Sequence, residues 1–341
     1  MGAAASILTM AALGWTSDRM GRKAFLVLSG GVFGLGISGL AVSGGYAALL
    51  VTLVVLYSAS GLYDVGINSA AVDLEQATGR RFMPLVHAAF SAGATVGAVG
   101  AGVLVQAGAD YRLVYLGLLA PLGLLLLGFA VARFPAGDGA GGAGGGAHYR
   151  LYRHLPILLV GGIATLGLGS EGEMEHWSGI YLRDTLGLPA LLGGSGVAVF
   201  YAAMAVGRLG TAGAVRLLGN RTTLLLAGLS TAAGMSLALA TREPVLVVGG
   251  FLIVGLSLAA VAPIAFSMAG DVAPGGTGAA VSVVTTLGYG GFLLGPVIVG
   301  GLAELAGLRT ALLTIVAAGL VIAALALRFS TAGGRSKPAS R

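Results

Sequence analysis

The chain has 341 residues, of which 56% are hydrophobic and 9% are charged, whereas a soluble domain carries about 25% charged residues. Together with a mean hydropathy of +0.94, this composition excludes a soluble globular protein and indicates that lipid surrounds most of the chain. The absence of cysteine excludes disulfides, thiolate metal sites and cysteine nucleophiles, and four scattered histidines leave little for a zinc site. We therefore expect no metal and no cofactor.

Eleven apolar segments follow one another along the chain, and most have roughly the 20 residues that cross a bilayer as a helix. The first is too short to cross, and none shows the alternation of a transmembrane strand. The predicted fold class is therefore an all-α polytopic membrane protein. The segments are Gly2–Leu13, Ala24–Ser43, Ala47–Gln76, Phe82–Ala107, Leu113–Phe134, Leu155–Leu182, Leu191–Leu209, Thr222–Thr241, Val245–Ala269, Ala279–Glu304 and Thr310–Phe329.

The distribution of positive charge predicts the orientation. When every Lys and Arg is assigned to a loop or span end, 15 of the 19 fall on one side of the membrane. By the positive-inside rule this side, which includes the C-terminus, is cytoplasmic. The net charge of +6 then reflects topology, and no nucleic-acid partner is expected. The four residues on the other side are Arg112, Arg183, Arg242 and Arg309.

An internal repeat divides the chain into two halves. An offset of 198 residues aligns Gly21 with Gly219 and Gly97 with Gly295. We expect a truncated N-terminal bundle over 1–134, a Gly-rich cytoplasmic linker over 135–154 and a six-helix bundle with a short tail over 155–341. Under this offset the counterpart of the sixth span would precede Met1, so the first helix and half of the second are expected to be missing.

The 61 glycines are unusual for helices in water, but in lipid small residues let helix backbones approach closely. Spaced pairs such as Gly93 with Gly97 are predicted to be packing surfaces of this kind. The glycine content is therefore compatible with the helical prediction.

One loop carries a specific motif, Gly14-Trp-Thr-Ser-Asp18-Arg19-Met-Gly21-Arg22-Lys23. It resembles the signature Gly-x-x-x-Asp-Arg-x-Gly-Arg-Lys of the major facilitator superfamily. The resemblance implies a gating loop at the cytoplasmic surface, in which Asp18 is predicted to pair with Arg80 or Arg81 in one access state. A degenerate copy in the second half, from Gly207-Arg208 to Gly219, lacks the acidic residue.

Shorter stretches resemble the bacterial branch related to fucose/proton symporters. They are Gly61 to Glu75, Met83 to Gly93 and Glu171 to Tyr181. The resemblance implies two six-helix bundles around a central cavity, working by alternating access. It further implies a monomer in the bacterial inner (plasma) membrane, with a small-molecule substrate and protons as its partners.

Ionisable side chains within a membrane span are costly, by at least about 2.5 kcal/mol each, and therefore call for a function. Asp64, Asn68 and Glu75 lie within about 40° of one another around a helix, because each residue advances by about 100°. They form one polar stripe, and Asp73 points to the opposite side. Asp64, predicted to lie near mid-span, is the leading candidate proton carrier, and His87 on the next span is a further candidate.

The sixth span contains a second acidic group, because Glu171 and Glu175 are one turn apart on one face. Three glycines surround Glu171 and are predicted to weaken the helix where a ligand could meet backbone groups. Trp177, further along, is predicted to be either an interfacial anchor or a substrate ligand.

The predicted function is secondary transport. No Arg or Lys falls in the middle of a predicted span, which favours a neutral or cationic solute. No phosphate-binding loop for an ATP-driven pump and no catalytic motif of a membrane enzyme is found in the sequence. Two alternatives stay open: a non-transporting, sensor-like or inactive truncated membrane protein, and an exporter of drugs or metabolites instead of a sugar importer.

Overall fold

The structure is a computed structural model that describes residues 2–134, 150–188, 195–272 and 277–329. Within these ranges the regular secondary structure is helical, and no strand occurs in them. The predicted all-α class is therefore confirmed. Most of the predicted Gly-rich linker, residues 135–149, lies outside the described ranges.

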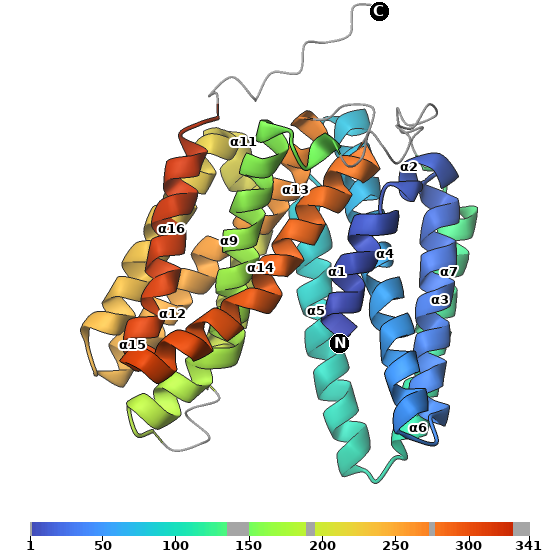
Figure 1. Cartoon of the computed structure of the whole chain (residues 1–341), viewed down its shortest axis with the longest axis horizontal. Helices are drawn as coiled ribbons and strands as arrows, with labels where there is room; N and C mark the ends of the chain where they lie inside the picture. Colours follow the sequence, from blue (N-terminus) through green and yellow to red (C-terminus); the bar gives the residue numbers. More distant parts are fainter. Residues whose placement is uncertain (1, 135–149, 189–194, 273–276, 330–341) are drawn as a thin grey trace, which may run out of the picture. The chain divides into compact units, whose positions relative to one another are not determined.

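The described chain forms two compact units. Unit 1 comprises Met1–Arg80, Ala89–Leu158 and Met268–Thr286. In it, α4 packs beside α1 and α3, and α3 also packs beside α6 and α7. Its helices (Figure 1) are α1 (Gly2–Leu13), α2 (Thr16–Met20), α3 (Arg22–Val42), α4 (Tyr46–Thr78), most of α5 (Met83–Gln106), α6 (Tyr111–Gly117) and α7 (Leu119–Val131).

Unit 2 comprises Arg81–Ala88, Leu159–Ser267 and Leu287–Arg341. Its long helix α11 packs against α12 and α16. Helices α13 (Val261–Val272) and α14 (Thr277–Ala306) are divided between the units, because Met268–Thr286 belongs to unit 1 and the residues on either side of it to unit 2. The elements are α9 (Leu155–Ile180), a π-helical turn (Tyr181–Thr185), α11 (Ser195–Ala240), α12 (Pro244–Leu258), α13 (Val261–Val272), α14 (Thr277–Ala306), α15 (Leu308–Ala311) and α16 (Leu313–Ala326).

Eight helical segments of the described chain are long and apolar enough to cross a membrane. One of them, Gly196–Ala240, is two helices joined at a non-helical residue, Gly219. The predicted end of a span at Leu209 is therefore wrong, because the helix continues to the kink. A polar residue, Arg208, suggested a boundary there, but its charge is compensated inside unit 2, as described below.

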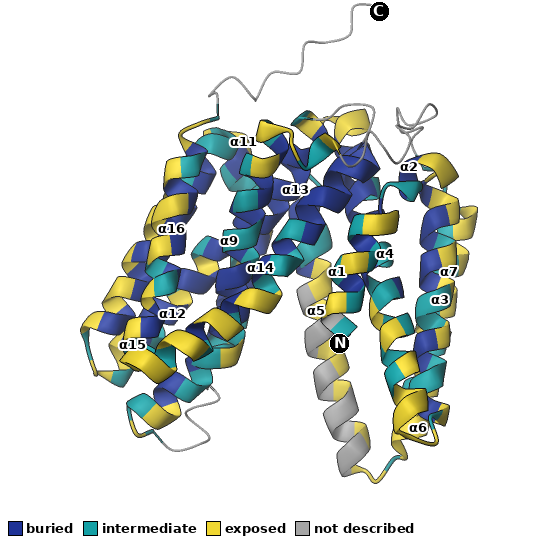
Figure 2. Ribbon diagram, in the orientation of Figure 1, coloured by how far each residue is buried: buried dark blue, intermediate teal, exposed yellow. Residues whose placement is uncertain are grey.

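Exposed apolar surface accompanies this architecture, as Figure 2 shows by the exposed residues along α7 and α16. Helix α7 has no buried residue, and Leu124 and Leu127 are 72% and 61% exposed. Such a surface would be a liability in water. In a bilayer it faces acyl chains, which agrees with the composition.

Glycines allow close helix packing in unit 2. Among the described residues, nothing lies within 4 Å of a Cβ built on Gly93 or Gly97, so a packing role for this pair stays a prediction. By contrast, a Cβ on Gly228 would lie 2.7 Å from the backbone nitrogen of Ala323, so α11 and α16 meet backbone to backbone. A different requirement applies to Gly21 and Gly219, which both have φ of +77°. The repeat aligns these two residues, and both precede a helical segment.

Candidate functional site

The predicted gating loop forms a buried charge cluster in unit 1. The side chains of Asp18, Arg22 and Asp73 are 3%, 5% and 3% exposed. Arg22 donates through Nη1 to Asp18 Oδ1 (2.9 Å), through Nε to Asp73 Oδ2 (2.6 Å) and through Nη2 to Asp73 Oδ1 (3.3 Å). The guanidinium therefore bridges two carboxylates, and its fork shape suits this two-pronged contact.

Asp18 also contacts the beginning of α14. Its Oδ1 accepts from the backbone N–H of Gly278 and its Oδ2 from that of Ala279, both at 2.8 Å. The first N–H groups of a helix lack intrahelical acceptors, and the helix dipole favours a negative charge there. One carboxylate therefore neutralises Arg22 and caps α14, and we call Asp18, Arg22, Asp73 and these two N–H groups the Asp18 latch.

Glycines make the close contacts at the latch possible. Gly21, between α2 and α3, has the positive φ that other residues rarely adopt. A Cβ on Gly278 would lie 2.6 Å from Asp18 Oδ1 and would also collide with Ser17. Gly14 is equally crowded by Ser282, whose hydroxyl donates to the Met10 carbonyl at 2.7 Å.

The remaining motif residues lie outside the latch. The Arg19 guanidinium stacks over the Trp15 ring at 4.6 Å, Lys23 is exposed, and Arg80 is exposed at the end of α4. In this structure Asp18 pairs with Arg22, whereas the sequence predicted Arg80 or Arg81. The pair of Asp18 in this structure is buried, and its pairing with Arg80 or Arg81 in another access state stays a prediction.

The polar stripe of α4 is present, but the buried ion pair of this helix lies on the face opposite the stripe. Asn68 is 2% exposed, and its Nδ2 donates to the Asp64 carbonyl at 2.9 Å. Asp64 is half-buried and Glu75 is 7% exposed. Asp73, predicted on the opposite side of the helix, lies buried against Arg22. The advance of about 100° per residue correctly places Asp73 on the face opposite the stripe. The helical period alone does not reveal which helix packs against that face.

A second polar cluster lies inside unit 2, between α9 and α11. Arg208 is 3% exposed, and its Nη2 lies 3.3 Å from both carboxylate oxygens of Glu171. One turn later, Glu175 Oε2 accepts from the Tyr201 hydroxyl at 2.7 Å. These four residues, which we call the Arg208 cluster, contain two carboxylates and one guanidinium and are formally negative by one charge.

The Arg208 cluster corrects two sequence-based expectations. Arg208 was placed at a cytoplasmic span end, and no cation was expected within a span, yet it lies well inside α11. A signal was available: the 198-residue offset pairs Gly219 with Gly21, which moves the helix end past Arg208. The contact between Tyr201 and Glu175 has no local signal in the sequence, because the two residues lie on different helices.

The glycines of α9 allow close contact with α14, which the sequence did not predict. The helix is regular from Leu155 to Ile180, so no break exposes backbone groups around Glu171 in this structure, and the weakening stays a prediction. A Cβ on Gly172 would lie 2.6 Å from the Phe292 carbonyl of α14. Trp177 also faces α14, because its Nε1 donates to the Pro296 carbonyl at 3.0 Å. In this structure that donor is used within unit 2.

His87 belongs to the short part of α5 that packs in unit 2. Its ring stacks on Phe266 with centroids 5.5 Å apart and an interplanar angle of 13°. An aromatic contact of this kind accounts for a partly buried imidazole without a ligand. A proton-carrying role for His87 stays a prediction.

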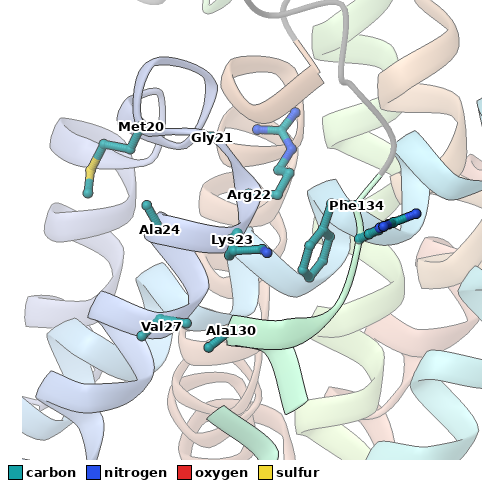
Figure 3. Close-up of a pocket in the computed structure, with 9 residues that line it drawn as sticks. Met20, Gly21, Arg22, Lys23, Ala24, Val27, Ala130 and Phe134 are labelled. Atoms are coloured by element: carbon teal, nitrogen blue, oxygen red, sulfur yellow. The ribbon is translucent and has the colours of Figure 1, made fainter. Parts of the chain in front are cut away.

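A cavity of about 750 Å³ opens beside the first turn of α3 in unit 1. Figure 3 shows Lys23 pointing towards Phe134, while Arg22 points away from them. This cavity is open at the surface, so it does not enclose a solute as a transport site must. Its lining residues are Met20, Gly21, Arg22, Lys23, Ala24, Val27, Ala130, Arg133 and Phe134.

Comparisons with known proteins agree with these features. The sequence profile described as Major Facilitator Superfamily matches residues 1–240 and 179–341. An uncharacterised MFS-type transporter of Yersinia pestis is 31% identical over 306 residues, which cover 90% of this chain and 79% of the relative. Membrane protein MosC of Rhizobium meliloti is 28% identical over 331 residues, which cover 96% and 79%.

The fold is shared with a solved structure of low sequence identity. The Escherichia coli fucose:proton symporter FucP matches with a TM-score of 0.79 and 16% identity, covering 96% of this chain and 90% of that protein. At this identity the likeness concerns the fold.

Proposed function

Because the chain belongs to the major facilitator superfamily, whose profile matches it from residue 1 to residue 341, we propose that it is a secondary active transporter coupled to protons. The protein carries a small neutral or cationic solute across the bacterial inner membrane by alternating access. The Arg208 cluster is the observation that carries this proposal.

The first supporting argument is energetic. A buried ion pair is weak evidence for stability, because desolvation of both ions offsets most of their attraction. Ionisable groups that persist inside a membrane protein therefore point to a ligand or ion pathway. In the Arg208 cluster Glu171 and Arg208 satisfy each other only at 3.3 Å, a distance at the loose end for a charged hydrogen bond.

The second argument concerns the charge of the solute. The sequence favoured neutral or cationic cargo because no cation was expected within a span, and Arg208 removes that premise. A neutral or cationic solute is favoured for another reason, because the cluster has two carboxylates, Glu171 and Glu175, and one guanidinium, Arg208. An anionic solute would face a cluster that already has an excess negative charge.

The third argument concerns gating. The Asp18 latch joins α2, α3 and α4 to the beginning of α14, a helix that continues into unit 2. A contact made in one access state and lost in the other sets the balance between those states. We assign this role to the latch, and the proton-carrying role to Asp64, as the sequence predicts.

The test uses the purified full-length protein in lightly buffered liposomes. Neutral monosaccharides, polyols and organic amines are added one at a time, and the external pH is followed. At least one solute should cause an external alkalinisation that a protonophore abolishes and that Glu171→Gln strongly reduces. Asp184→Asn, which removes an exposed pair with Arg183, is the matched control and should respond like the wild type.

Two outcomes would contradict the proposal. Uptake of a solute without any pH change would indicate a uniporter, and transport of anions alone would refute the assigned charge preference. A response unchanged in Glu171→Gln would remove the Arg208 cluster from the pathway.

A further inference from the structure

A third carboxylate of α9 faces neither the Arg208 cluster nor solvent. Glu173 lies about 200° around the helix from Glu171 and is 7% exposed. Its Oε2 accepts from the Thr314 hydroxyl of α16 at 2.8 Å. On its other side, Oε1 would lie 3.2 Å from a Cβ on Gly295, so the backbone of α14 covers it.

The surroundings of Glu173 hold little to compensate a negative charge. An ionised carboxylate has about four acceptor sites, and one hydroxyl serves one of them. Within the described ranges, no Lys, Arg or His lies within ion-pairing distance of Glu173. A charge in such a place is costly, whereas the protonated acid is a neutral hydrogen-bonding group.

The charged and titratable groups on the elements around Glu173 are directed elsewhere or neutral. On α9, Glu171 and Glu175 bind Arg208 and Tyr201, and His176 Nδ1 contacts the Gly172 carbonyl at 2.8 Å. On α14, the titratable side chains are the Tyr289 phenol and Glu304, which is exposed. On α15, Arg309 donates to the Leu239 carbonyl, and the described α16 carries no charged residue.

The helix that covers Glu173 has a local weakness at that level. Pro296 has no N–H, so the Phe292 carbonyl lacks its usual helical donor. At this place α9 and α14 are held together by the tight Gly172 contact and by the bond from Trp177 to Pro296. A charge on Glu173 would require water where these backbones now touch.

We propose that Glu173 is a proton-binding site that controls the packing of α9 against α14. With a proton bound, the carboxyl group stays in its dry site and the two helices remain in contact near Pro296. When the proton leaves, the carboxylate draws in water and the contact around Trp177 loosens. This site differs from the Asp64 stripe, and the proposal does not depend on which solute is carried.

Trp177 reports directly on this contact. The chain has two tryptophans, so Trp15→Phe leaves Trp177 as the single tryptophan, which is excited at wavelengths that tyrosine does not absorb. Its emission is measured between pH 4.5 and 9 in liposomes without any solute. The proposal predicts a reversible red shift as the pH rises, and Glu173→Gln should abolish it and hold the emission at its acid-side value.

Two controls separate Glu173 from neighbouring groups. Glu175→Gln removes a carboxylate on the opposite face, and His176→Gln removes an imidazole that could itself gain a proton in this range. Both should keep the transition. If Glu173→Gln does not accumulate in membranes, Glu173→Asp replaces it and should keep a transition with a displaced midpoint.

Any of three results would overturn the proposal: no transition in the Trp15→Phe protein, an unaltered transition in Glu173→Gln or Glu173→Asp, or loss of the transition in His176→Gln. Because no solute is present, these results are independent of the transport assay above. A protein that transports solutes but shows no Glu173 transition would refute only this inference.

Discussion

The Asp18 latch leads to the most discriminating prediction. Asp18→Asn removes the ion pair with Arg22 and the negative charge at the start of α14. The amide oxygen can still accept one backbone hydrogen bond, but the amide NH₂ then faces a second donor. Arg22 keeps its two bonds to Asp73 in this variant, so its charge stays paired. The expected cost is therefore that of leaving buried donors without an acceptor, about 1–3 kcal/mol.

Two matched variants calibrate this value. Asp184→Asn breaks a pair whose side chains are 54% and 53% exposed, which should cost about 0–1 kcal/mol. Asp73→Asn removes the charge and one of the two oxygens that Arg22 contacts, without touching α14. Asp18→Asn and Asp73→Asn should therefore both lower the thermal unfolding midpoint clearly, whereas Asp184→Asn should not. Only Asp18→Asn should also change the balance between access states.

That balance is measured by electron–electron double resonance between spin labels at the exposed residues Thr78 and Leu217. A loss of about 1–3 kcal/mol in one state corresponds to a change of about 5- to 100-fold in the population ratio, at roughly 1.4 kcal/mol for each factor of ten. Asp18→Asn should redistribute the label distances, and Asp73→Asn should leave them nearly unchanged.

A steric variant tests the same contact without removing a charge. Gly278→Ala places a methyl group against Ser17 and Asp18, whereas a Cβ on Gly31 of α3 meets nothing within 4 Å. Gly278→Ala should reproduce the distance change of Asp18→Asn, and Gly31→Ala should not. The gating role of the latch would be refuted if Asp18→Asn lowers the thermal unfolding midpoint no more than Asp184→Asn and leaves the spin-label distances as they are in the wild type.

Three further predictions concern other parts of the chain. Asp64→Asn should abolish proton-driven accumulation of the solute but retain counterflow, because only the titration is lost; unchanged accumulation with an unchanged pH profile would exclude Asp64 as the carrier. Cysteines at Ala143 and Thr185 should react with impermeant reagents from the cytoplasmic and the external side, respectively, and external labelling of Ala143 in intact cells would reverse the topology. Gly219→Ala should destabilise by about 1–2 kcal/mol, since an alanine resists positive φ, whereas Gly210→Ala, in open helical space, should not; equal effects in a thermal denaturation assay would contradict this.

The class of the protein and most of its helices follow from local properties of the sequence. Hydrophobicity over about 20 residues reflects the transfer of that segment alone into lipid, so no knowledge of its neighbours is needed. The expected segment Ala47–Gln76 corresponds to α4, observed as Tyr46–Thr78. The expected segment Leu155–Leu182 corresponds to α9 and its π-helical turn.

The same local reasoning failed where a charge is compensated from another helix. Arg208 suggested the end of a span, because a lone guanidinium cannot remain in lipid, and its partner Glu171 is 37 residues away. The glycines beside Glu171 suggested a weakened helix, although the close backbone of α14 explains them. The composition shows that glycines are present, but it does not show which helix packs against them.

The sequence by itself indicated that Glu171 and Glu175 would need a partner inside the membrane, because the cost of burying a charge belongs to the residue. It also determined that Gly21 marks a turn, since its motif requires backbone freedom at that position. Only the tertiary structure decided the partners. Asp18 accepts from the N–H groups of Gly278 and Ala279, which lie 260 and 261 residues further along the chain. Its bond to Arg22, four residues away, is local by comparison. Ion pairs and close backbone contacts depend on distances between helix faces, which are set by the packing of whole helices and not by any single segment.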